Sequence, residues 1–123
     1  MDYTLELVVV PVSDVDRAKA FYADKCGFVV DVDRQFTESF RVVQLTPPGS
    51  ACSICIGTGL TSMKPGLIEG LQMVVPDIEK AHDELAERGV DVSDVQDLAW
   101  GRFVYFSDPD GNKWAVQQLP RRG

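Results

Sequence analysis

Apolar and polar residues follow nearly the same pattern in the two halves of the chain. In each half a valine-rich run precedes an acidic motif, which reads Ser-Asp-Val-Asp-Arg-Ala at 13–18 and Pro-Asp-Ile-Glu-Lys-Ala at 76–81. Each motif continues into a stretch with apolar residues at helical spacing, and that stretch stops at a glycine, Gly27 or Gly89. Because the two motifs lie about half the chain apart, the pattern predicts two similar modules that fold as one domain.

The first module, residues 1–57, is expected to contain a strand, a helix and three further strands. Ser13 or Asp14 caps the helix, since short polar side chains accept hydrogen bonds from its first N–H groups. The Pro47-Pro48-Gly49 sequence forms the turn between the last two strands. The five elements are expected at Thr4–Pro11, Val15–Lys25, Phe28–Arg34, Phe40–Thr46 and Ala51–Gly57.

A connector at 58–66 leads to the second module, residues 67–123, in which the order of elements repeats. Asp77 caps the helix, and Asp108-Pro-Asp-Gly-Asn112 has the composition of a turn between the last two strands. The fold class is therefore α+β: two tandem βαβββ modules form a curved mixed sheet with a cleft, and the helices lie on its outer face. The elements of the second module are expected at Leu67–Val75, Ile78–Arg88, Val90–Val95, Arg102–Ser107 and Lys113–Leu119.

Charge and composition narrow the classes of partner. Asp and Glu total 19 against 12 Lys and Arg, a net charge of −7, and an acidic surface repels the phosphates of nucleic acids. No apolar run approaches the roughly 20 residues of a membrane span, and the first residues lack the basic start and apolar stretch of a secretory signal. We therefore expect a cytoplasmic protein with no nucleic-acid or membrane partner. The three cysteines, an odd number, argue against a disulfide framework.

Two motifs resemble those of the vicinal oxygen chelate superfamily, which includes glyoxalase, extradiol dioxygenases, fosfomycin-resistance enzymes and bleomycin-resistance proteins. The sequence Val-Ser-Asp-Val-Asp-Arg-Ala-Lys-Ala-Phe-Tyr at 12–22, followed by Gly27-Phe28, is similar to the first module of that family. The turn at 108–112 is similar to its last hairpin. The resemblance covers nearly the whole chain and implies the same fold, but one fold hosts many chemistries.

The resemblance also implies where a divalent metal would be held, and this chain departs from the family pattern there. Leucine, glycine and alanine offer no nitrogen, oxygen or sulfur donor to a metal. Glu6 and Glu69 stand next to two of the positions, but adjacent strand residues point to opposite faces. We therefore expect no metal and no other cofactor. The family's ligand positions correspond here to Leu7, Gly70, Ala115 and the stretch Ser53–Cys55.

A cleft with small and apolar residues at those positions is expected to bind a small molecule, since ligand pockets are mostly apolar with a few placed polar groups. Stacking on a ligand and ordinary packing are equal alternatives for Trp100. A surface ion pair with one of the many carboxylates is the alternative for Arg102. The residues expected to bind the ligand are Leu7, Phe36, Phe40, Gln44, Gly70, Gln72, Trp100, Arg102, Ala115 and Gln117.

The faces of the last two strands follow from the register expected for their hairpin. Trp100, Arg102 and Val104 alternate along one predicted strand. The usual hairpin register places them on the same face as Ala115 and Gln117. Three aromatic residues of these strands are expected in the core, namely Phe103, Tyr105 and Trp114.

Two classes of function follow from these expectations. The first is a metal-independent binding protein that resembles bleomycin-resistance-type members and holds an aromatic or cationic ligand in the inter-module cleft. The alternative is a lyase, isomerase or dioxygenase of the glyoxalase superfamily with an atypical or absent metal site, and a further one is an accessory domain that acts through protein contacts. The resemblance also implies a homodimer in which modules pair across two chains, while a monomer with the cleft inside one chain stays open.

Overall fold

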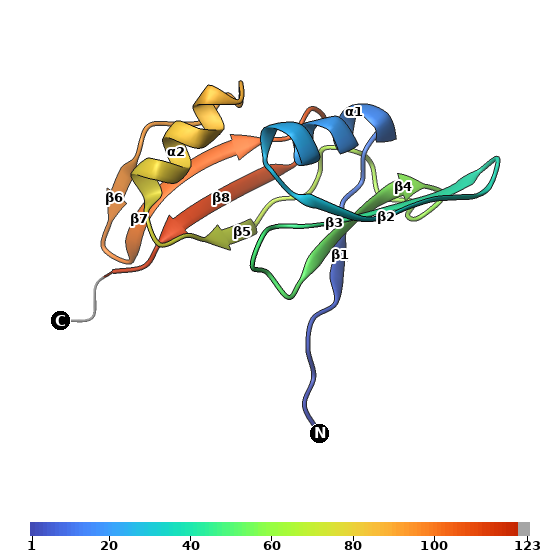
Figure 1. Cartoon of the computed structure of the whole chain (residues 1–123), viewed down its shortest axis with the longest axis horizontal. Helices are drawn as coiled ribbons and strands as arrows, with labels where there is room; N and C mark the ends of the chain where they lie inside the picture. Colours follow the sequence, from blue (N-terminus) through green and yellow to red (C-terminus); the bar gives the residue numbers. More distant parts are fainter. Residues whose placement is uncertain (121–123) are drawn as a thin grey trace.

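The computed structural model describes residues 1–120, which form two four-stranded sheets with a helix on one side of each (Figure 1). The first sheet has the order β1-β4-β3-β2 and consists of β1 (Leu7–Val9), β2 (Val29–Thr37), β3 (Phe40–Thr46) and β4 (Ser53–Thr58). The second has the order β5-β8-β7-β6 and consists of β5 (Leu71–Val74), β6 (Gln96–Leu98), β7 (Gly101–Ser107) and β8 (Lys113–Gln118). In each sheet one edge strand pairs in parallel and the other pairings are antiparallel. The α+β fold with tandem modules is confirmed, although the strands form two sheets rather than one.

The helix of each module starts at a capping aspartate. The Asp14 carboxylate accepts a hydrogen bond from the backbone N–H of Arg17 at 3.0 Å, and the Asp77 carboxylate accepts one from Lys80 at 3.1 Å. Both helices lie on the same side of the strands (Figure 1), so each sheet has a helix-covered face and an open face. No helix within residues 1–120 is long and apolar enough to cross a membrane. The helices are α1 (Val15–Ala20), which continues into the π-helical turn η1 (Phe21–Lys25), and α2 (Ile78–Glu87).

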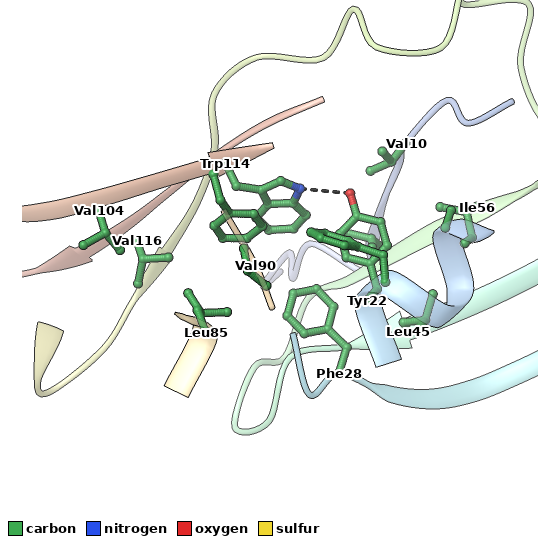
Figure 2. Close-up of a cluster of buried hydrophobic side chains, with 14 of the residues drawn as sticks. Val10, Tyr22, Phe28, Leu45, Ile56, Leu85, Val90, Val104, Trp114 and Val116 are labelled. Carbon is green, nitrogen blue, oxygen red and sulfur yellow. Dashed lines mark hydrogen bonds between the residues drawn. The ribbon is translucent and has the colours of Figure 1, made fainter. Parts of the chain in front are cut away.

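One hydrophobic core is shared by the two modules (Figure 2). Tyr22 and Phe28 of the first module lie against Trp114 of the second, each with its ring centroid 5.7 Å from that of the indole. Phe106 stacks on the same indole, with centroids 5.9 Å apart and planes 3° apart. The prediction that Trp114 is a core residue is confirmed. The aliphatic residues drawn around these rings include Val10, Leu45, Ile56, Leu85, Val104 and Val116.

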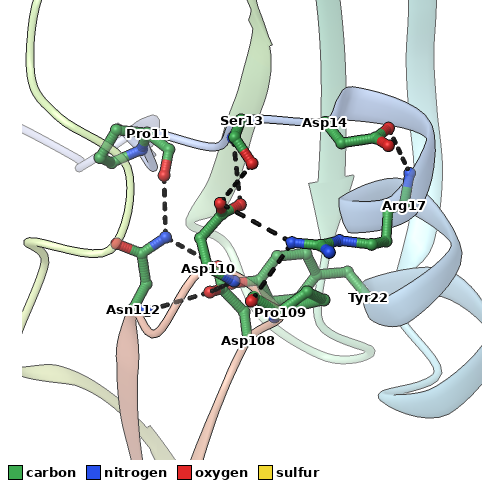
Figure 3. A network of polar contacts seen from close by, with 9 residues as sticks. All are labelled: Pro11, Ser13, Asp14, Arg17, Tyr22, Asp108, Pro109, Asp110 and Asn112. Carbon is green, nitrogen blue, oxygen red and sulfur yellow. Dashed lines mark hydrogen bonds and ion pairs between the residues drawn. The ribbon is translucent and has the colours of Figure 1, made fainter.

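A buried polar cluster joins the modules beside these rings (Figure 3). The Tyr22 hydroxyl donates to Asp108 Oδ2 at 2.7 Å and accepts from Trp114 Nε1 at 3.0 Å. Asn112 Nδ2 donates to Asp108 Oδ2 at 2.8 Å and to the backbone oxygen of Pro11 at 2.9 Å. We call Tyr22, Asp108, Asn112 and Trp114 the inter-module latch. The turn expected only to connect two strands therefore also fastens one module to the other.

The prediction of a strand at Val90–Val95 is wrong, because the chain enters the sheet only at Gln96. Local backbone bonds hold the start of this segment, where Val90 N donates to Leu85 O and Val92 N donates to Val90 O, while Ser93 N donates to Tyr105 O of β7. The segment still contributes to the core, since Val90 is buried. Valines at irregular spacing thus pack against the core without the alternation of a ladder strand.

The strands expected at Thr4–Pro11 and Leu67–Val75 are shorter in the structure. Before β5 the backbone turns at Gly70, which has φ +91°. Ile68 N donates instead to the side-chain oxygen of Asn112 at 3.1 Å, next to the latch. In both modules the residues ahead of the edge strand leave the sheet.

Replacing Tyr22 with phenylalanine is expected to destabilise the fold by about 1–3 kcal/mol, because the buried indole N–H of Trp114 would lose its acceptor. Chemical denaturation of the variant measures the loss. Tyr105→Phe makes the same chemical change at an exposed side chain and should shift the free energy of unfolding by less than about 0.5 kcal/mol. Equal effects of the two substitutions would contradict the role of the latch.

Stability is expected to fall at alkaline pH, because burial raises the pKa of the Cys26 thiol from 9.0 to about 12. Nearby Asp108 raises this pKa further, against the opposing charges of Arg88 and Lys25. The folded state keeps the proton after the unfolded state has lost it. The free energy of unfolding should therefore decline from about pH 9, with this thiol contributing up to about 1.4 kcal/mol per pH unit until pH 12. Denaturation of Cys26→Ala between pH 8 and 11 should show a shallower decline, and an unchanged slope would refute the assignment.

Candidate functional site

The strand register assigns each side chain of the second sheet to a face, since residues paired across adjacent strands point the same way. Trp114 marks the helix-covered face, so the neighbouring Ala115 points to the open face. Gln72 pairs with Ala115, and Val74 pairs with Gln117. Gln72, Ala115 and Gln117, all three expected to bind the ligand, therefore lie on the same face. Five residues of this open face form the candidate site of the second sheet, namely Gln72, Phe103, Tyr105, Ala115 and Gln117.

The face predicted for Arg102 and Val104 is wrong. The turn at 108–112 contains five residues, so Ser107 pairs with Lys113 and the pairing continues with Val104 opposite Val116. Val104 is fully buried under α2. The same register moves Phe103 and Tyr105 from their expected core positions to the open face. The sequence did contain the signal for this register, namely the odd number of residues in the turn. Such a turn pairs the odd-numbered residues of β7 with the odd-numbered residues of β8.

Arg102 lies on the helix-covered face and is held there by two carboxylates. Its Nη2 atom lies 3.0 Å from Oε1 of Glu79 in α2, and its Nε atom lies 2.7 Å from Oδ1 of Asp97. Hydrogen bonds to these two carboxylates raise the pKa of the guanidinium. The ion-pair alternative therefore describes Arg102, and its side chain points away from the open face.

Trp100 stands in the turn between β6 and β7 rather than in a strand, with 63% of its surface exposed. Its backbone oxygen accepts a hydrogen bond from Gln117 Nε2 at 2.8 Å, and Gln117 Oε1 accepts one from Gln72 Nε2 at 2.6 Å. Gly101 makes this possible, since a β-carbon there would lie 2.8 Å from Gln117 Nε2 at a φ of +149°. The chain of amides positions the Trp100 turn at the rim of the open face.

An aromatic pair lies beside the amides on the same open face. The rings of Phe103 and Tyr105 are parallel within 3°, with centroids 5.9 Å apart. Phe103 is buried, whereas 37% of Tyr105 is exposed. Tyr105 therefore offers an aromatic surface to solvent, next to the small side chain of Ala115, with which it pairs.

Two predicted residues, Leu7 and Gln44, lie on the open face of the first sheet. Leu7 pairs with Ser53, and Gln44 pairs with Cys55, so these four side chains point away from α1. Cys55 and Ser53 are buried even on this side. The three cysteines are free thiols. The open face of the first sheet is thus a mixture of apolar, amide, hydroxyl and thiol groups.

Phe36 and Phe40 form an aromatic tip at the end of the β2–β3 hairpin. Their ring centroids are 5.3 Å apart, and the Arg34 guanidinium carbon lies 4.8 Å from the Phe36 centroid. Arg34 pairs with Val42, which has the same parity as Gln44, so this tip lies at the far end of the open face. The prediction that Phe36 and Phe40 flank the turn between two strands is confirmed.

A polar trio on the open face of the first sheet was missed by the sequence analysis. The Thr46 hydroxyl hydrogen-bonds the Asp31 carboxylate and lies 2.6 Å from the hydroxyl of Ser53. Asp31 occupies an irregularity in the β2–β3 register, where the alternation of faces is broken. The odd–even alternation of side chains along β2 could therefore not have predicted the position of Asp31. Because Ser53 pairs with Leu7, only the side chains of Thr46 and Ser53 lie between the Asp31 carboxylate and Leu7.

A groove of about 550 Å³ runs along the seam between the modules. One wall is the β3–β4 turn, residues 47–50, and the other is β5 with the adjoining side of α2. Phe28 and Val116 lie at its apolar floor, and Arg88 and Glu84 are its charged residues. Of the ten predicted ligand-binding residues, only Gln72 lines the groove. The others divide among the two open faces, the two hairpin ends, the helix-covered face, where Arg102 lies, and Gly70, which stands exposed just before β5.

The residues at the family's metal positions do not fit a metal ion. The side chains of Leu7, Gly70 and Ala115 carry no donor atom, and Ser53 contributes a neutral hydroxyl, a weak ligand for transition metals. Within residues 1–120 no three His, Cys, Asp or Glu side chains are grouped so that they could hold a metal ion. Gln72 and Gln117 use their amides on each other and on the Trp100 backbone.

Comparison with known proteins places this chain in one family. Residues 4–116 match the model of the Glyoxalase/Bleomycin resistance protein/Dioxygenase superfamily. The structure of TnmS3, an antibiotic binding protein from Streptomyces sp. CB03234, is similar with a TM-score of 0.88 and 34% sequence identity. The alignment covers 97% of this chain and 98% of that one.

Two further relatives agree with that placement. A glyoxalase/bleomycin resistance protein from Streptomyces sp. CB03234 is 36% identical, with a TM-score of 0.82, over 94% of this chain and 100% of that one. The uncharacterized protein YetH of Bacillus subtilis (strain 168) is 26% identical over 90% of this chain and 94% of its own length. From the family match and these relatives, the chain belongs to the glyoxalase/bleomycin resistance protein/dioxygenase superfamily.

Proposed function

We propose that this protein is a metal-independent binding protein that holds a small aromatic or cationic molecule on the open faces of its sheets. The observation that carries the proposal is the composition of the second open face. An aromatic pair and a chain of amides surround Ala115, where family members present a metal ligand. The relation to TnmS3, named an antibiotic binding protein, supports the same class of function.

The aromatic side chains supply stacking surfaces at three places. Tyr105 exposes its ring on the second open face, and Trp100 stands exposed at the rim. Phe36 and Phe40 form the tip of the first sheet, with half of the Phe36 surface exposed. Ring pairs in offset or edge arrangements contribute about 0.5–1.5 kcal/mol each beyond the area they bury. A flat ligand would gain most at such a site.

The polar groups of the open faces favour a ligand with a positive charge or hydrogen-bond donors. Asp31 presents an exposed carboxylate that the Thr46 hydroxyl holds in place. The amides of Gln72 and Gln117 add oriented dipoles on the other sheet. The net charge of −7 attracts cations at long range.

We also propose that two copies of the chain form a homodimer that completes the site in the cytoplasm, where free thiols stay reduced. Large apolar side chains on or beside the open faces are exposed in a single chain: Val29 by 54%, Val74 by 60% and Trp100 by 63%. Large apolar side chains exposed on or beside both open faces favour an interaction surface there. In the dimer the first sheet of one copy would face the second sheet of the other, and the ligand would lie between them.

Thermal-shift measurements with a panel of fused-ring aromatic antibiotics, with and without an amino group, test this function. At least one compound is expected to raise the melting temperature, and excess EDTA should leave the shift unchanged. Tyr105→Ala should weaken binding of that compound about tenfold, because its stacking surface is removed. Titration calorimetry measures the change.

Arg102→Gln is the matched control, since Arg102 lies on the helix-covered face and its exposed ion pairs contribute little stability. Its affinity for the compound should equal that of the wild type. Loss of binding in EDTA, or one transition metal ion per chain in the purified protein, would refute the metal-independent site.

A further inference from the structure

One carboxylate of β2 reaches the open face of the first sheet through an irregularity in the strand. The residues on either side of Asp31 pair with β3, but the register skips Asp31 itself. A bulge of this kind redirects a side chain, and bulges are common next to active sites. The Asp31 carboxylate accepts a hydrogen bond from the hydroxyl of Thr46, which lies on the same face as Gln44. Asp31 therefore points to the open face.

Two hydroxyl groups hold this carboxylate in place. The Thr46 hydroxyl has a single proton, and the Asp31 carboxylate accepts it. The Ser53 hydroxyl lies 2.6 Å from the Thr46 oxygen and must therefore be the donor of that pair. Because only 4% of Ser53 is exposed, its bond to Thr46 is also what satisfies its buried hydroxyl. The donors thus run in one direction, from the buried Ser53 to the exposed Asp31.

The Asp31 carboxylate keeps its capacity to bind a cation. Among residues 1–120 no ion pair involves Asp31. Asp33, two residues further along β2, lies 2.9 Å from a guanidinium nitrogen of Arg41 and 2.7 Å from Nζ of Lys19. The charge of Asp33 is therefore compensated within the chain, on the helix-covered face. The charge of Asp31 is left for a partner that comes to the open face.

The cationic side chain of this open face lies well away from Asp31. Arg34 pairs with Val42, and its guanidinium carbon lies 4.8 Å from the ring centroid of Phe36. Val42 stands four residues from Thr46 along β3, which corresponds to about 13 Å of extended strand. This separation exceeds the screening length of about 8 Å at physiological salt. A cation at Asp31 therefore meets little repulsion from Arg34.

We propose that Asp31 is the subsite for a protonated amine, and that it selects aromatic ligands that carry an aliphatic amine on a side chain. This inference rests on the proposed function and names one group of its ligand. A carboxylate that is oriented before binding loses little conformational freedom when the ligand arrives. The hydrogen bond from an ammonium group to a carboxylate is also stronger than one between neutral groups. The planar part of the same molecule stacks on the exposed rings of the site.

Two compounds that differ in one charge test the subsite: an anthraquinone with an aminoethylamino side chain, and the same compound acetylated on its primary amine. By titration calorimetry the wild type is expected to bind the amine about tenfold more tightly than the amide. Asp31→Asn keeps an acceptor for Thr46 but removes the charge, so it should bind both compounds equally. Its affinity for the acetylated compound should equal that of the wild type, which a structural defect at this position would not allow.

Two further variants locate the effect. Asp24→Asn removes the same charge from an exposed position of η1, which continues the helix of the covered face, and should leave both affinities unchanged. Thr46→Val removes the supporting donor and should lower the affinity for the amine about threefold, with no change for the acetylated compound. Thermal unfolding of each variant shows that it is folded.

Equal affinities of the wild type for the two compounds, or no binding of the amine, would overturn the subsite. A preference for the amine that survives in Asp31→Asn, or that disappears in Asp24→Asn, would overturn it as well. An unchanged preference in Thr46→Val would contradict the part given to the hydroxyl groups. The proposed function is judged separately, because the thermal-shift panel also contains aromatic compounds without an amino group.

Discussion

The whole arrangement depends on one buried carboxylate. Asp108 Oδ2 accepts hydrogen bonds from Tyr22 and from Asn112 Nδ2, while Oδ1 accepts the backbone N–H groups of Asp110 and Asn112. Such a charge is tolerated in the interior because every bond it needs is made. Tyr22 also accepts from Trp114, which stands at the centre of the shared core. The two modules thereby pack into one folded unit with a shared apolar core.

The latch decides where binding chemistry can occur. It fastens the modules at their helix-covered faces, so both sheets turn their open faces to the other side of the molecule (Figure 1). Those faces carry Leu7 and Ala115 at two of the positions where the family resemblance implied metal ligands, and their polar groups include amides, hydroxyls and the Asp31 carboxylate. Stacking rings, dipoles and a negative charge are the groups on which the proposed recognition of a small molecule depends.

The alternation of side chains along a strand predicted the shared face of residues within β8. It did not predict which residues of β7 lie on that face. Gln72, Ala115 and Gln117 share a face because strand side chains alternate, and parallel pairing keeps that alternation in step. Arg102 was predicted on the wrong face because the five-residue turn pairs it with Gln118 and not with a residue on the face of Gln117. Asp31 was missed because an irregular register breaks the alternation of β2. Site residues were thus predictable only where no bulge or turn intervened.

From the chain alone came the internal repeat, the aspartate caps, the glycine-rich turns and the absence of donor atoms at Leu7, Gly70 and Ala115. These are local properties, set by the chemistry of a few neighbouring residues. Only the tertiary structure decided that the 108–112 turn would bond to Tyr22, and that Phe103 and Tyr105 would lie on the face of the sheet opposite the helix. It also left the outer edge of β5 without a strand partner among residues 1–120. Those outcomes depend on register and on contacts between residues far apart in the chain, which local patterns do not encode.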